Sequence, residues 1–254
     1  MKVIAVANQK GGVGKTTTSI NLGTALANLG KRTLILDLDP QANATSGLGL
    51  ESDINKSIYP VLTEEAKVED CIQDTRFENL KIIVGHMDLS GVEVELATSE
   101  HRLTLLRTAL APIREQASFD YILFDTPPSL GVLMTASIAS ADEVLIPLQC
   151  EWFGLEGLAK ITHIIKEIRE SGHNDQISLN GILMTMFDNR TNLSKQVVSE
   201  VETYFPEEIY KTKIPRSIRI SEAPSHGLTI FEHDAKGQGA EAYKAFAEEF
   251  IERN

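Results

Sequence analysis

The segment Asn8-Gln9-Lys10-Gly11-Gly12-Val13-Gly14-Lys15-Thr16-Thr17 decides the fold of this chain. It follows the apolar run Val3–Ala7 and opens an apolar-periodic segment that ends at Gly30. This pattern predicts a strand, a phosphate-binding loop and a helix. Glycines let the loop turn its backbone N–H groups toward an anion, and the start of the helix adds the positive end of its dipole. The expected ligand is therefore a nucleotide polyphosphate.

The loop departs from the usual Gly-x-x-x-x-Gly-Lys-Thr pattern at two positions. Gln9 occupies the place of the first glycine, and an additional lysine, Lys10, lies inside the loop. Lys15 is expected to contact the β- and γ-phosphates, and the Thr16 hydroxyl to bind Mg²⁺. Because Lys15 already supplies a cation, we expect Lys10 to meet the phosphates of a facing copy, as an arginine finger does in trans. The alternative is a lysine that only faces solvent.

Strand-like and helix-like segments alternate along the whole chain. This alternation specifies an α/β fold with a doubly wound, mainly parallel sheet flanked by helices. Residues 51–79 are polar and show no clear period, and no linker divides the chain, so we expect one domain over residues 1–254. The predicted strands are 3–7, 33–40, 82–85, 121–125, 143–148 and 182–187, and the predicted helices are 16–29, 95–115, 158–168, 192–204 and 240–253.

Three aspartates follow or end predicted strands. Asp125 ends an apolar strand and is the expected magnesium ligand opposite the Thr16 hydroxyl. Asp37 and Asp39 would point to the same side if their strand continues to Asp39. We expect Asp39 to orient the water that attacks the γ-phosphate, and Asp37 to support magnesium or the loop geometry. The alternative for each of these two is a cap of the turn at 41–46.

The loops at the carboxyl ends of the predicted strands carry these candidate residues. In a doubly wound sheet, ligands bind outside the carboxyl ends of the strands, so these loops should converge. The loops are 8–17, 39–50, 125–131, 186–192 and 214–221.

Composition restricts the other candidate functions. The formal net charge of −12 argues against a whole surface built to coat nucleic acid, although one basic cluster stands out late in the chain. Lysine and arginine side chains in such a cluster can contact nucleic-acid phosphates without reading the bases. The alternative is that the cluster is only a solvated charged face. Cys71 and Cys150 are far apart and predict packing rather than a metal site or disulfide. The cluster comprises Arg190, Lys195, Lys211, Lys213, Arg216 and Arg219.

No apolar run is long enough for a signal sequence or a membrane span, so we expect a cytoplasmic protein. The C-terminal segment Glu241–Asn254 carries four glutamates and two cations, a balance that anionic lipid would repel. A membrane-surface role is therefore disfavoured.

Several motifs occur together in this chain. The most specific are Lys10–Thr17, Asp37-Leu38-Asp39-Pro40-Gln41 and Asp125-Thr126-Pro127-Pro128-Ser129-Leu130-Gly131. The others are Asn43–Gly49, Glu156-Gly157-Leu158, Thr191-Asn192-Leu193, Ile214-Pro215-Arg216 and Ser221–Gly227. Over essentially its whole length the chain resembles the ParA/Soj family of partition ATPases, the members of the MinD/ParA superfamily with a deviant Walker loop.

The resemblance implies a weak ATPase that uses ATP and Mg²⁺ and forms an ATP-bound sandwich dimer. Lys10 would cross the dimer interface, while Asp39 would position water. Pro215 and Ser217 would lie near the adenine, where Ser217 replaces the asparagine often found in the family. The residues implied to hold the phosphates are Lys10, Gly11, Gly12, Val13, Gly14, Lys15, Thr16 and Thr17.

The resemblance also implies a role in chromosome or plasmid partition. The dimer would bind double-stranded DNA without sequence preference, with Arg190 and Arg219 as phosphate contacts, and would associate with the nucleoid. Hydrolysis, stimulated by a ParB/Spo0J-like partner through a short basic peptide, would release it. The alternatives are an orphan ParA that positions a protein cargo on the nucleoid and, less favoured, a MinD-like membrane-surface ATPase.

Overall fold

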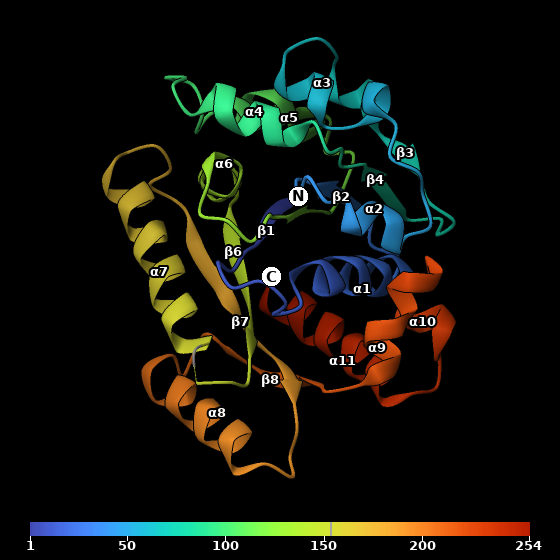
Figure 1. The fold of residues 1–254 in the computed structure, drawn as a ribbon, viewed down its shortest axis with the longest axis vertical. Coiled ribbons are helices and arrows are strands. Elements are labelled where there is room, and N and C mark those ends of the chain that lie inside the picture. Colours follow the sequence, from blue (N-terminus) through green and yellow to red (C-terminus); the bar gives the residue numbers. More distant parts are fainter. Residues whose placement is uncertain (153) are drawn as a thin grey trace.

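The computed structural model describes residues 1–152 and 154–254 (Figure 1). In this part of the chain, eight strands form one sheet in the order β3-β4-β2-β5-β1-β6-β7-β8. All neighbours pair in parallel except β3 and β4, so the predicted doubly wound, mainly parallel fold is confirmed. The strands are β1 (Lys2–Val6), β2 (Thr33–Asp37), β3 (Gln73–Asp74), β4 (Leu80–Ile83), β5 (Tyr121–Asp125), β6 (Glu143–Gln149), β7 (Ser178–Phe187) and β8 (Ile209–Pro215).

Helices cover both faces of the sheet (Figure 1). Successive side chains of a strand point to opposite faces, and accordingly Val3 and Ala5 pack into one apolar cluster while Ile4 and Val6 pack into another. The second cluster contains α1 (Lys15–Asn28) and α11 (Gln238–Arg253). The first contains α3 (Tyr59–Leu62), α4 (Leu89–Leu96), α5 (Leu105–Gln116), α6 (Val132–Ser140), α7 (Gly154–Glu170) and α8 (Asn192–Tyr204).

Short helices complete the structure between the longer elements. They are α2 (Asn43–Gly47), α9 (Ile218–Glu222), α10 (Ile230–His233) and the 3₁₀ turns η1 (Ile54–Lys56), η2 (Val68–Cys71) and η3 (Ala223–His226). In Figure 1, α3, α4 and α5 gather at one end of the molecule and α8 lies at the other.

Strand β1 lies at the point where the strand order reverses. It pairs with β5 on one side and β6 on the other; β2, β4 and β3 lie beyond β5, and β7 and β8 lie beyond β6. At such a point the connections leave in opposite directions, which opens a crevice at the carboxyl ends of the strands. The phosphate loop follows β1 directly into this crevice.

The predicted helix over residues 95–115 is confirmed for residues 105–115 but is interrupted before them. The chain instead forms α4 and α5, joined by turns over residues 97–104. The His101 N–H donates to Ser99 Oγ at 3.2 Å, and the His101 carbonyl accepts from the Thr104 N–H at 2.9 Å. These local bonds compete with a continuous helical ladder. Leu106 and Leu110 still pack into the core as their spacing predicted.

Among the longer elements, α6 and β8 were not predicted, and strand β2 is shorter than predicted. Helix α6 is built of apolar and small residues and is buried over most of its surface, so it shows no amphipathic period. Strand β8 is the edge of the sheet, and the polar succession Lys211–Lys213 hides its strand character. Strand β2 ends at Asp37, so Asp39 lies beyond it.

Candidate nucleotide-binding site

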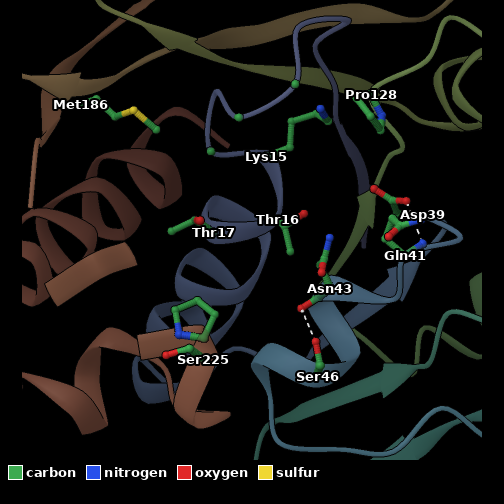
Figure 2. A pocket seen from close by; sticks show the side chains of 14 residues that line it. Lys15, Thr16, Thr17, Asp39, Gln41, Asn43, Ser46, Pro128, Met186 and Ser225 are labelled. Carbon is green, nitrogen blue, oxygen red and sulfur yellow. Dashed lines mark hydrogen bonds between the residues drawn. The ribbon is translucent and has the colours of Figure 1, made fainter. Parts of the chain in front are cut away.

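A pocket of about 560 Å³ lies at the carboxyl ends of the strands, around the phosphate loop (Figure 2). Gly12 and Gly14 have φ values of 74° and 93°, a left-handed conformation that glycine adopts without strain. No described side chain caps α1, so its first N–H groups are open to a ligand. The lining residues are Gly11, Gly12, Gly14, Lys15, Thr16, Thr17, Asp39, Gln41, Asn43, Ser46, Pro128, Met186, Pro224 and Ser225.

Side chains from neighbouring strands hold the loop in this shape. Asn8 Nδ2 donates to the Pro147 carbonyl at 2.8 Å, and its Oδ1 accepts from the Lys10 N–H at 3.0 Å. On the other side of the loop, Thr185 Oγ1 donates to the Val13 carbonyl at 2.8 Å. Local sequence patterns do not identify these roles of Asn8 and Thr185, since Pro147 and Val13 lie far from them along the chain.

Lys15 lies inside the loop and is only 6% exposed. Its ammonium approaches the Lys10 carbonyl at 3.5 Å. Burial lowers the pKa of Lys15, and the charges of Asp125 and Asp39 oppose that shift. An anion in the pocket would stabilise the charged form of this lysine, which is the role predicted for it.

Asp125 is fully buried and incompletely hydrogen bonded. Its Oδ1 accepts from Ser19 Oγ at 2.9 Å, whereas its Oδ2 has no hydrogen-bond partner among the described residues. Burial, reinforced by the Asp37 charge and opposed by Thr16, Ser19 and Lys15, raises the pKa of Asp125 to about 8. A cation at Oδ2 would satisfy this oxygen and stabilise the carboxylate, so Asp125 and the Thr16 hydroxyl fit a magnesium ion.

Asp37 and Asp39 occupy different environments. Asp37 is completely buried, and its Oδ2 accepts from the Thr45 N–H at 2.9 Å and from Thr45 Oγ1 at 2.7 Å. Burial raises the pKa of Asp37 to about 6 despite these bonds. Asp39 lines the pocket, and its Oδ1 accepts from the Gln41 N–H at 3.0 Å. The condition of the same-side prediction is not met, because β2 ends at Asp37; the bonds from Thr45 give Asp37 a loop-supporting contact.

Lys10 lies outside the pocket lining. Its Nζ forms an ion pair with Glu151 Oε2 at 2.9 Å, and the other carboxylate oxygen, Oε1, accepts from Gln149 Nε2 at 2.7 Å. The neighbouring Trp152 is 65% exposed. The two lysines of the loop therefore differ: Lys15 is enclosed by the loop, whereas Lys10 is half-buried beside it.

A smaller pocket of about 140 Å³ adjoins the first and shares Gly14, Thr17 and Met186 with it. Pro215 and Ser217 line this second pocket, next to the site at which phosphates would lie. Contact of Pro215 and Ser217 with an adenine remains a prediction.

Most of the basic cluster gathers where β7 and β8 end. Phe187 pairs with Pro215, which brings the loop after β7 beside the Arg216 backbone. Arg190 is paired with Asp188 at 2.8 Å, and Arg219 with Glu222 at 3.5 Å. Lys213 approaches Glu202 at 4.0 Å, while Lys195 on α8 is exposed.

Lys211 lies farther from the loop after β8 than Lys213 does. It lies near the start of β8, where its backbone N–H donates to Glu249 and its side chain lines a separate pocket with Arg253. A strand extends about 3.3 Å per residue, so β8 carries Lys211 away from the loop that follows Pro215. Membership of Lys211 in one DNA-binding cluster remains a prediction.

Comparison with known proteins identifies the family. A family model described as an AAA domain matches residues 1–179. The sporulation initiation inhibitor protein Soj of Bacillus subtilis is 47% identical over 249 residues, 98% of this chain and 97% of Soj. The chromosome partitioning protein ParA of Myxococcus xanthus is 45% identical over 254 residues, 100% of this chain and 89% of ParA. The chain belongs to the ParA/Soj family of partition ATPases.

Solved structures agree with this membership. Apo McdA of Cyanothece matches this ParA/Soj chain with a TM-score of 0.88 and 26% identity over 99% of both chains. Cobyrinic acid a,c-diamide synthase of Mycobacterium smegmatis, solved with ADP and magnesium, matches with a TM-score of 0.82 and 34% identity over 98% of this chain and 93% of the synthase. Within residues 1–152 and 154–254, no helix has the length and apolar character that crossing a membrane requires.

The raised pKa of Asp125 gives a pH-dependent stability. A carboxyl whose pKa is higher in the folded state binds its proton more tightly there, so stability falls as pH rises from about 4 to about 8. Without nucleotide, Asp125→Asn should therefore raise the thermal unfolding midpoint near pH 8.5 and change it little near pH 5. We expect about 2–4 °C for each kcal/mol gained, measured by circular dichroism. The exposed Asp74→Asn is the control; an equal shift of Asp125→Asn at both pH values would contradict the prediction.

Proposed function

We propose that this ParA/Soj member is an ATP-hydrolysing partition protein whose ATP-bound dimer binds DNA and is released by hydrolysis. The observation that carries the proposal is the separation of the two loop lysines. Lys15 lies in the pocket, whereas Lys10 pairs with Glu151 outside the pocket lining. A lysine held beside its own loop can contact phosphates if a second copy of the chain brings its bound nucleotide next to it.

The pocket supports a specific placement of ATP. The phosphates would accept from the N–H groups of residues 11–17 and from Lys15, while the adenine would enter the smaller pocket at Pro215 and Ser217. Magnesium, held by Thr16 and Asp125, would neutralise charge on the β- and γ-phosphates. No group of three or more His, Cys, Asp or Glu side chains forms a metal site in the described chain, so the phosphates would complete its coordination.

Asp39 is the residue that we propose to orient the attacking water. It lies at the pocket wall opposite Lys15 (Figure 2), and its Oδ2 is not used by the bond to Gln41. A carboxylate at this place would accept a hydrogen bond from a water molecule aligned with the γ-phosphate. Asp37 would support it indirectly, because Asp37 Oδ1 accepts from the Asp39 N–H at 3.3 Å.

The cations at the ends of β7 and β8 support DNA binding. Arg190, Lys195, Arg216 and Arg219 are exposed and lie on neighbouring elements. Arginine and lysine contact phosphates irrespective of sequence. A dimer would present two such surfaces on one duplex, so nucleotide-driven dimerisation would raise the DNA affinity through multivalency. Binding of this kind would place the protein on the nucleoid in the cytoplasm.

The cargo distinguishes two candidate functions. Full-length similarity to chromosome partitioning proteins favours chromosome segregation with a ParB/Spo0J-like partner. The similarity to McdA favours the second candidate, positioning of a protein cargo on the nucleoid. Both candidates use the same ATP-driven cycle, and neither requires a membrane.

Lys10→Ala should prevent the ATP-dependent dimer while leaving nucleotide binding largely intact, because Lys10 lies outside its own pocket. Light scattering after size exclusion, with ATP and Mg²⁺, measures the mass, and a fluorescent ATP analogue measures binding. Lys160→Ala is the matched control, since Lys160 also forms a single ion pair, with Glu156 at 2.8 Å. A normal dimer of Lys10→Ala would remove the proposed role in trans.

Asp39→Ala should slow hydrolysis by roughly 10²-fold or more and leave the ATP-bound dimer on DNA. Phosphate release measures the rate, and sedimentation with long duplex DNA measures retention. Asp53→Ala is the control for turn capping, because Asp53 Oδ1 accepts from the Asn55 N–H at 3.0 Å, as Asp39 does from Gln41. If both variants hydrolyse ATP at the wild-type rate, another residue must orient the water.

Arg219→Glu should weaken DNA binding on the order of tenfold or more at low salt. The affinity should also depend less steeply on salt, since each phosphate contact adds roughly 0.9 to the slope of log affinity against log salt concentration. Fluorescence anisotropy of a labelled duplex, with ATP and Mg²⁺, measures both quantities. Dimerisation should be unchanged. Arg102→Glu, between α4 and α5 at the opposite end of the molecule, is the control; equal losses in both variants would show a net-charge effect rather than a DNA-binding face.

A further inference from the structure

Arg76 joins segments that are far apart along the chain. It lies in the turn between β3 and β4, and its guanidinium donates to the carbonyls of Leu48 and Gly227, the latter at 2.8 Å. Leu48 is the C-cap of α2, and Gly227 is the C-cap of η3. The same guanidinium pairs with Glu232 of α10, where Nη2 lies 2.6 Å from Oε2. One side chain therefore connects α2, η3 and α10.

The segments that Arg76 joins form one side of the nucleotide pocket. Asn43 and Ser46 of α2 line the pocket, and so do Pro224 and Ser225 of η3. Figure 2 shows Asn43, Ser46 and Ser225 together on one side of the pocket. We call the surface formed by these four residues the α2–η3 wall. Arg76 is not among the residues that line the pocket, so it acts on the site through the wall.

The two segments of the wall touch each other closely. A Cβ at Gly49 would lie 3.0 Å from the Gly227 carbonyl oxygen, and a Cβ at Gly227 would lie 3.0 Å from Gly49 Cα. Within the described part of the chain, no hydrogen bond runs directly between residues 43–49 and residues 223–229, and Arg76 bonds to both segments. Arg76 is therefore the polar link between the two halves of the wall.

Glu232 fixes the orientation of the Arg76 guanidinium. Its Oε1 accepts from Arg76 Nε and its Oε2 from Arg76 Nη2, while Oε2 also accepts from the Thr229 N–H at 3.0 Å. Burial raises the pKa of Glu232, but the bonds from Arg76 and Thr229 outweigh burial and hold this pKa below its ordinary value. A planar guanidinium forms this bidentate pair and reaches two carbonyls at the same time, whereas a lysine ammonium offers a single nitrogen.

We propose that Arg76 is a positioning residue that holds the two halves of the α2–η3 wall together against a bound nucleotide and thereby slows nucleotide release. The effect on release rests on the placement of ATP proposed above, whereas the link within the wall does not. Without Arg76, only van der Waals contacts join the two segments directly, so the wall opens more often. A nucleotide that lies against the wall leaves during such openings.

Hydrogen exchange without nucleotide tests the link within the wall. In the full-length protein, Arg76→Ala should speed the exchange of backbone amides in residues 43–50 and 223–229 several-fold, measured by mass spectrometry, because the polar link is lost. The matched control is Arg114→Ala, since Arg114 pairs with Asp142 at 3.1 Å and donates to a neighbouring carbonyl but does not line the pocket. Exchange in these segments at the wild-type rate in Arg76→Ala would overturn the proposal.

Release of a fluorescent ADP analogue measures the effect on the nucleotide. When excess unlabelled ADP displaces the analogue in the presence of Mg²⁺, Arg76→Ala should release it about tenfold faster than wild type. Arg76→Lys should release it nearly as fast as Arg76→Ala, because lysine keeps the charge but not the fork. Single-turnover hydrolysis of bound ATP should change far less than release, because Arg76 bonds to none of the residues proposed for hydrolysis.

The variants also separate this role from a loss of stability. Melting followed by circular dichroism shows whether each variant folds, and Glu232→Gln replaces Arg76→Ala if the latter does not. Glu232→Gln removes the charge that orients Arg76, so it should also speed exchange and release. Equal acceleration of release in Arg114→Ala would show a general loss of stability and would overturn the proposal.

The two measurements distinguish the failure of one proposal from the failure of the other. If Arg76→Ala speeds exchange in the wall but the wild type binds no nucleotide, the link within the wall stands and the placement of ATP fails. If the wild type binds the analogue and Arg76→Ala releases it at the wild-type rate, the role of Arg76 in release fails and the placement of ATP stands.

Discussion

The Asp125 carboxylate is the constraint on which the rest of this structure depends. It ends β5 beside β1, fully buried, with one oxygen that no described group satisfies. A buried charge without a partner is costly, and the pKa near 8 reflects that cost. The site therefore favours a bound cation, and an anion to accompany it. Nucleotide with magnesium supplies both charges in one ligand.

Lys15, Asp37 and Asp125 show how the fold keeps this arrangement together. Burial disfavours the charged form of all three, and each partly offsets the cost through neighbours: Lys15 through the carboxylates, Asp37 through Thr45, Asp125 through Ser19. The hydrogen bonds that anchor the phosphate loop to β6 and β7 fix its N–H groups before any ligand arrives. Such preorganisation reduces the entropy lost on binding.

The Lys10–Glu151 pair gives the second lysine a resting position in its own subunit. The two side chains are 30% and 45% exposed, so the pair contributes at most about 1 kcal/mol. So weak a contact is easily exchanged for a phosphate of a second copy. One subunit therefore supplies the groups that bind a nucleotide. Under the proposed function, the ATP-bound state also needs Lys10 of a second subunit.

The sequence by itself determined the α/β class, the strand–loop–helix unit at residues 3–30 and the residue types of the phosphate site. These follow from local signals: continuous apolar runs, glycine spacing and helical periodicity. Local sequence patterns do not predict an element whose residue pattern depends on its position in the fold. The polar strand β8 and the buried helix α6 lack the expected periods because β8 lies at the sheet edge and α6 is enclosed by the rest of the chain.

Only the tertiary structure decided which candidate residues are buried and which groups they contact. It gave Asp37 and Asp39 different partners and left one Asp125 oxygen without a hydrogen bond among the described residues. It also placed Gly85 beside Asp37 and the Glu93 carboxylate beside Gly131, contacts between residues 38 or more positions apart. The chemistry of the site could be predicted from the sequence because it depends on residue types. The burial of each side chain and its hydrogen-bond partners could not, because they depend on how distant segments pack.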